Sequence, residues 1–251
     1  MLRYCLPLLP TQVMWWVMNA SDRYVLTAFA GSAAVGLYSV GNKIPHLLSL
    51  FENIFYQSWQ TSAVSSYNSE ERDKFYSDVF NKYFSILTVG VLGLLIVCKP
   101  AIDILFEQSY ADAWLCVAPL IIGVLVHALS GNLGTFYGVF KKTRGALITS
   151  LVGAITNVVL NFIFIPLYGF VAAAVTTLIG YLATLFARWN DVSKYVNITI
   201  EKKKTILYIF FILIQTFLYY EVGAWSYVLR IVIMTYVAFS ERKLIFSLLK
   251  R

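Results

Sequence analysis

Eight apolar stretches follow one another along this chain, each long enough or nearly long enough to cross a bilayer. A hydrocarbon core of about 30 Å requires about 20 apolar residues in helical form. Inside hydrocarbon every backbone N–H and C=O must be bonded within its own segment, so each stretch is predicted to be an α-helix. The sequence therefore predicts an all-α, polytopic membrane helix bundle of about eight transmembrane helices. The stretches are residues 6–29, 33–62, 79–97, 114–140, 146–165, 170–187, 205–220 and 224–239.

The composition agrees with a membrane protein. Hydrophobic residues make up 59% of the chain and charged residues 13%, whereas soluble domains contain about 25% charged residues. We therefore expect a single transmembrane domain over residues 1–251. The first six helices (6–187) would form its core, residues 205–239 an accessory helix pair, and residues 240–251 a cytoplasmic tail.

The basic residues are distributed unevenly between the two sides of this bundle. Eight spans place both termini on one side, together with the loops at 63–78, 141–145 and 188–204. Sixteen of the twenty basic residues fall on that side, which predicts that both termini are cytoplasmic. This asymmetry accounts for the net charge of +7 without a nucleic-acid partner. The four remaining basic residues are Arg23, Lys43, Lys99 and Arg230.

The stretch 33–62 is predicted to be one helix about 45 Å long, with its polar residues on a single face. Lys43 would lie near the membrane midplane, where a lysine requires water, a partner or a ligand. Pro45 removes the hydrogen bond to the Gly41 carbonyl, so we expect a kink beside Lys43. The polar residues of this face, at steps of three or four, are Asn42, His46, Ser49, Asn53, Gln57 and Gln60.

Other polar residues in the spans allow two interpretations each. Asp22 and Arg23 would form a local ion pair, or Arg23 would belong to a cationic cavity wall. A single histidine such as His127 is more often a hydrogen-bonded structural residue than a proton relay. Asn157 and Asn161 are one helical turn apart, and in hydrocarbon such amides usually bond to neighbouring helices. Substrate contact is the alternative for both asparagines.

The region from Asn157 to Tyr181 carries a specific pattern, N-x-x-L-N-x-x-x-I-P-x-x-G-x-x-A-A-A-x-T-T-x-x-x-Y. It resembles the C-terminal bundle of bacterial polysaccharide flippases, the O-antigen or repeat-unit translocases of the MOP (MATE-like) superfamily. Members of that family have about fourteen helices in two lobes, and this chain resembles the second lobe only. Further matching residues are Asp22-Arg23, Gly36-Leu37-Tyr38-Ser39, Lys43-Ile44-Pro45 and Lys141-Lys142-Thr143.

The resemblance implies transport of undecaprenyl-diphosphate-linked oligosaccharide repeat units across the bacterial inner membrane. The implied partners are this lipid-linked glycan, membrane lipids, and a separate N-terminal lobe or a second copy of the chain. The expected substrate-binding residues are Arg23, Lys43, Asp22, Asn42, His46 and Asn53. The expected helix-packing residues are Asn157, Asn161, Pro166 and Gly169.

Three other interpretations stay open from the sequence. They are a cation-coupled multidrug antiporter of the same superfamily, a membrane glycan polymerase or acyltransferase, and an inactive truncated product. The sequence shows no nucleophile–base set, no clustered cysteine and histidine ligands and no glycine-rich phosphate loop. We therefore predict no enzyme activity, no catalytic residue, no metal and no cofactor.

Overall fold

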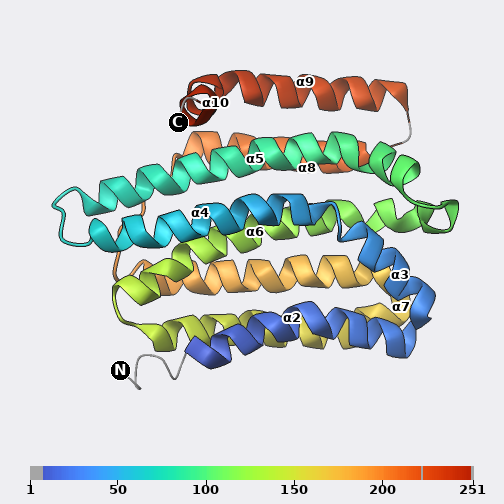
Figure 1. The fold of residues 1–251 in the computed structure, drawn as a ribbon, viewed down its shortest axis with the longest axis horizontal. Coiled ribbons are helices and arrows are strands. Elements are labelled where there is room, and N and C mark those ends of the chain that lie inside the picture. Colours follow the sequence, from blue (N-terminus) through green and yellow to red (C-terminus); the bar gives the residue numbers. More distant parts are fainter. Residues whose placement is uncertain (1–7, 222, 250–251) are drawn as a thin grey trace.

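The computed structural model describes residues 8–221 and 223–249 and folds them into helices joined by short connections (Figure 1). Within these residues there is no β-strand, and the predicted all-α fold is confirmed. The helices are α2 (Leu8–Phe29), α3 (Gly31–Gly41), α4 (Pro45–Ser65), α5 (Arg72–Leu105), η1 (Gln108–Ala113), α6 (Trp114–Val139), α7 (Thr143–Val192), α8 (Lys202–Tyr220), α9 (Ala224–Ser240) and α10 (Arg242–Leu249).

The long helices lie side by side, and their connections gather at the two ends of the bundle (Figure 1). The beginning of α2, the connections that follow α4, α6 and α7, and α10 all lie at one end. The connections that follow α2, α5 and α8 lie at the other end. The predicted basic loops therefore share one end of the molecule; that this end faces the cytoplasm stays a prediction.

Among the residues that the structure describes, three helical segments are long and apolar enough to cross a membrane, and α9 is a shorter apolar helix. The three are Arg72–Leu105, Gln108–Val139 and Thr143–Val192. Side chains such as Leu167 and Phe186, 69% and 70% exposed, point away from the protein. Exposed apolar surface on long apolar helices is suited to lipid, so the bundle is a membrane-embedded one.

The predicted fifth and sixth spans form two legs of the helix α7, which folds back at Gly169. Gly169 has φ 60° and ψ −140°, a conformation that is essentially restricted to glycine. Pro166 remains within the helical part of the first leg. The reversal of the chain is therefore at Gly169.

The prediction of one continuous helix over 33–62 is wrong. α3 ends at Gly41 and α4 begins at Pro45, so the expected kink is a complete break. Proline is well suited to the first turn of a new helix. Gly41 packs closely on η1 and α6, since a Cβ atom there would lie 2.9 Å from the Ala113 carbonyl oxygen.

Two other predicted boundaries also differ from the structure. The third span was expected to end at 97, before Lys99 and Pro100, but α5 continues through Pro100 to Leu105. The predicted late loop at 188–204 is shorter, because α7 extends to Val192 and α8 begins at Lys202. In both cases helical structure continues over polar residues that were expected to lie outside a helix.

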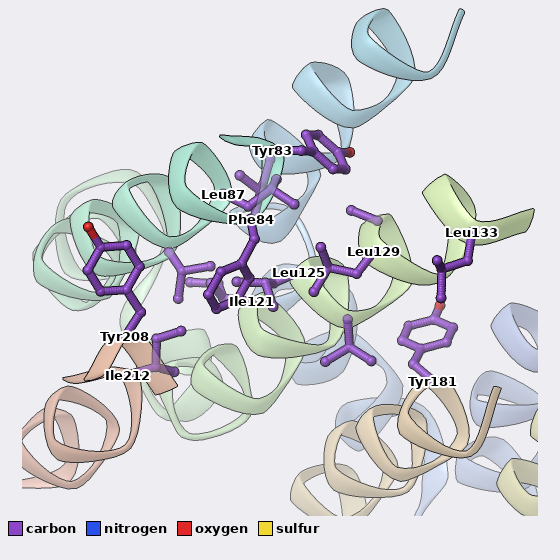
Figure 2. Packing of buried hydrophobic residues seen from close by; sticks show 14 of the residues in the cluster. Tyr83, Phe84, Leu87, Ile121, Leu125, Leu129, Leu133, Tyr181, Tyr208 and Ile212 are labelled. Atoms are coloured by element: carbon purple, nitrogen blue, oxygen red, sulfur yellow. The ribbon is translucent and has the colours of Figure 1, made fainter. Parts of the chain in front are cut away.

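The larger cluster of buried apolar side chains extends over most helices and is richest in residues of α5 and α6. Figure 2 shows Leu87 of α5 and Ile121 and Leu125 of α6 pointing toward one another, with Tyr208 and Ile212 of α8 beside them. α6 is central, because it contacts α4, α5, α7 and α8. α6 therefore connects the part of the molecule formed by α8 and α9 with the part formed by α2 and α7.

Candidate functional site

A cavity of about 590 Å³ opens between α2, α4, α6 and the second leg of α7. Polar and aromatic side chains line most of it. Its lining residues are Trp16, Asn19, Ala20, Arg23, Tyr24, Tyr38, Asn42, His46, Ser49, Glu52, Asn53, Leu120, Val124, His127, Thr177 and Tyr181.

Four of the six predicted substrate-binding residues line this cavity: Arg23, Asn42, His46 and Asn53. They come from α2, from the break between α3 and α4, and from α4. Asp22 is not among the lining residues. It lies behind the wall, 1% exposed and hydrogen-bonded to the lining residues Tyr38 and Thr177.

Lys43 is the predicted residue that lies apart from the others. Its side chain is exposed, and its Nζ atom lies 5.2 Å from the centroid of the Phe106 ring. It is absent from the cavity lining, although its neighbour Asn42 is part of it. The structure therefore does not bring Lys43 together with Arg23, Asn42, His46 and Asn53.

Of the two interpretations of Asp22 and Arg23, the local ion pair is not formed. Successive residues on a helix point about 100° apart, and here Asp22 is buried whereas Arg23 is exposed to the cavity. Within residues 8–221 and 223–249, no carboxylate lies within ion-pair distance of Arg23. The guanidinium group is therefore available to a ligand.

The Asp22 carboxylate accepts hydrogen bonds from four side chains. Tyr38 and Thr177 donate to Oδ2, each at 2.6 Å. The amide groups of Asn161 and Asn157 donate to Oδ1 at 2.7 Å and 3.3 Å. No basic side chain in the described part of the chain pairs with it. A buried carboxylate without a counter-ion is costly, and these four hydrogen bonds offset part of that cost.

Asn157 and Asn161 connect three helical segments. Ser21 of α2 donates to Oδ1 of Asn157 at 2.9 Å. Thr176, on the second leg of α7, donates to Oδ1 of Asn161. Both amides are fully buried. Through these bonds α2 and the two legs of α7 meet at Asp22.

A second polar pair at the cavity comes from residues that the sequence did not connect. The Nδ1 atom of His127 on α6 lies 2.7 Å from Oε1 of Glu52 on α4. The rings of Trp15 and Tyr181 lie 4.6 Å and 5.0 Å from the His127 ring. The sequence signal was present, because Glu52 follows Ser49 by three residues on the polar face, but its partner lies on another helix.

The cavity is lined by groups that can bind a polar or anionic molecule. It offers one unpaired guanidinium, several amide and hydroxyl groups, and the exposed aromatic rings of Trp16 and Tyr24. Amides and hydroxyls can bond to sugar hydroxyls, and aromatic faces can pack on sugar rings. In the described residues no group of three or more His, Cys, Asp and Glu could hold a metal ion.

Comparison with known proteins shows similarity of fold. No family model matches the sequence, and no curated protein sequence matches it. Among solved structures, the chain resembles the lipid II flippase MurJ in an inward closed conformation, with a TM-score of 0.69 and 18% identity over 94% of this chain and 53% of that one.

It also resembles a multidrug resistance MATE family transporter of the MOP superfamily, in an outward-facing conformation. The TM-score is 0.59, with 20% identity over 87% of this chain and 52% of that one. At these identities the similarity shows the fold, and the chain spans about half the length of both structures. The predicted MATE-like membrane bundle is thus confirmed.

Proposed function

We propose that this chain is one lobe of a flippase that moves lipid-linked, diphosphate-bearing oligosaccharides across the bacterial inner membrane. The observation that carries the proposal is Arg23. It is a cation without a carboxylate partner in the described residues, in a cavity of about 590 Å³ lined mainly by polar and aromatic groups. The fold similarity to a lipid II flippase supports the same substrate class.

The chemistry of the cavity fits an amphiphilic anion. A guanidinium binds diphosphate oxygens through two parallel hydrogen bonds. Asn42, Asn53 and Ser49 would bond to sugar hydroxyls, and the polyprenyl chain would remain in the surrounding lipid. Binding is reversible and involves no covalent step. A cationic drug is the less favoured substrate, because Arg23 would repel it.

Transport by alternating access requires two bundles that rock around a central site. The chain spans about half of each similar structure, so we propose that the cavity faces a second lobe. That lobe is either a separate N-terminal bundle or a second copy of this chain. The basic residues at one end of the bundle would then lie on the cytoplasmic side.

We propose Asp22 as the coupling site of this transporter. Its carboxylate is buried and lacks a basic partner among the described residues. From α2 it is hydrogen-bonded to α3 and to both legs of α7. Binding or loss of a proton or a monovalent cation there would change contacts in all of these helices. Tyr38 and Thr177 also line the cavity, which connects the two sites physically.

The test is complementation of a bacterial strain that lacks its polysaccharide flippase. The chain is expressed alone, and also together with an N-terminal lobe from a flippase of the same fold. Rescue by either, lost in Arg23→Gln at equal membrane levels, supports the proposal. Rescue that is indifferent to Arg23→Gln, or no rescue in either arrangement, contradicts it.

A further inference from the structure

A second cavity lies at the open end of the α7 hairpin, where the two legs of this helix meet the connection from α6. Its volume is about 630 Å³, and it shares no lining residue with the first cavity. Basic side chains dominate its mouth. Its lining residues are Lys141, Lys142, Thr143, Arg144, Gly145, Ile148, Thr149, Val152, Ala187, Asn190, Asp191, Lys194 and Tyr195.

Three of the four basic side chains in this cavity are available to a ligand. Lys194 Nζ lies 2.9 Å from Asp191 Oδ1, and this hydrogen bond raises the pKa of Lys194. Lys194 therefore neutralises the only carboxylate of the lining. Over the described ranges, no carboxylate lies within ion-pair distance of Lys141, Lys142 or Arg144.

The backbone adds to this positive potential. α7 begins at Thr143, and its N-cap residue Lys142 makes no side-chain capping bond. The first N–H groups of a helix lack partners within the helix, and its dipole attracts anions. A phosphate in the cavity would therefore meet both helix donors and basic side chains.

An apolar stripe leads out of the cavity along the first leg of α7. Ile148 and Val152 belong to the lining and are 61% and 42% exposed. Ile155 and Val159 follow and are 60% and 50% exposed. The steps of four, three and four keep these residues on one helical face, over about 16 Å. A ligand for this surface needs an anionic head and an apolar chain.

We propose that this cavity binds the headgroup of an anionic phospholipid from the adjacent leaflet. The phosphate lies between Lys142, Arg144 and the beginning of α7, and one acyl chain follows the stripe from Ile148 to Val159. Basic pockets between helices at this face of a membrane are suited to such lipids. The apolar stripe favours a lipid over a soluble phosphate, because a soluble phosphate has no apolar part that could contact it.

The test measures lipids bound to the purified full-length chain by native mass spectrometry. Phosphatidylglycerol and phosphatidylcholine are compared as probes, with the double variant K142Q/R144Q and the control K202Q/K203Q. The control removes two exposed lysines at the start of α8, outside the cavity. We expect about tenfold weaker phosphatidylglycerol binding in K142Q/R144Q, and wild-type binding in the control.

Equal losses in the two double variants would overturn the proposal, because they would show attraction by total charge. Displacement of phosphatidylglycerol by millimolar inorganic phosphate would also overturn it in favour of a soluble anion. If K142Q/R144Q does not fold, the single variants K142Q and R144Q answer the same question. Lipid binding is measured without transport, so this result is independent of the proposed flippase activity.

Discussion

The Nδ1 atom of His127 lies 2.7 Å from Oε1 of Glu52 and thereby joins α6 to α4 at the cavity. The Trp15 ring meets the imidazole edge-on at 84°, so α2 also contacts the pair. Both residues are mostly buried, with side-chain exposures of 32% for His127 and 11% for Glu52. A substitution of either residue would therefore alter the contacts of three helices that form the cavity, α2, α4 and α6.

Glu52→Gln and His127→Gln are predicted to be non-additive in a double-mutant cycle. A partly exposed, charge-assisted hydrogen bond contributes about 1 kcal/mol, and this is the coupling we expect in thermal unfolding in detergent. The control cycle uses Glu71→Gln and Lys74→Gln, whose exposed pair is 3.8 Å apart. Coupling energies of similar size in the two cycles would contradict the prediction that the Glu52–His127 pair stabilises the fold more than an exposed surface pair does.

Asp22→Asn is predicted to abolish transport while the protein still folds. Asparagine keeps the shape of the side chain and can accept bonds at one position, but it cannot carry the charge that a coupling ion requires. Asp22→Ala should in addition lower stability by about 3 kcal/mol, because it leaves several buried donors unpaired. Transport and thermal unfolding are measured together. The exposed Asp103→Ala serves as control, and transport retained by Asp22→Asn would refute the coupling proposal.

Gly153→Ala is predicted to destabilise the α7 hairpin by about 1–3 kcal/mol. A Cβ atom at Gly153 would lie 2.8 Å from the Gly180 carbonyl oxygen and would overlap Thr184 on the opposite leg. Gly93→Ala is the control, because its nearest neighbour, Met234 Cε, would be 3.7 Å away. The two variants are compared by thermal unfolding. An unchanged unfolding temperature for Gly153→Ala would contradict the prediction, because it would show that the two legs of α7 can move apart without loss of stability.

The sequence predicts the helices better than their pairings. Apolar length located the helices, and Gly169 lies at the turn between the predicted fifth and sixth spans. The Glu52–His127 pair was missed because these residues are far apart in sequence, and only the packing of α4 on α6 brings them together. A local ion pair of Asp22 and Arg23 was one of two interpretations of the sequence. It does not form, because a helix turns consecutive side chains in different directions.

Lys43 illustrates the same limit. Its position near the membrane midplane was extrapolated from one continuous helix over 33–62, but the chain breaks between Gly41 and Pro45. Local sequence indicated a weak point at Pro45. The local sequence could not predict the close packing of Gly41 against Ala113, because these residues are far apart along the chain.

The most direct test of the account is binding of an undecaprenyl-diphosphate oligosaccharide to the purified chain, alone and with an N-terminal lobe. Wild type, Arg23→Gln and Lys43→Gln are compared by native mass spectrometry or a fluorescent analogue. Each variant removes one exposed cation. We predict about tenfold or greater weakening for Arg23→Gln, from the loss of charge-assisted bonds to the diphosphate, and a small change for Lys43→Gln. Equal effects of the two, or binding unaffected by Arg23→Gln, would contradict a substrate site in this cavity.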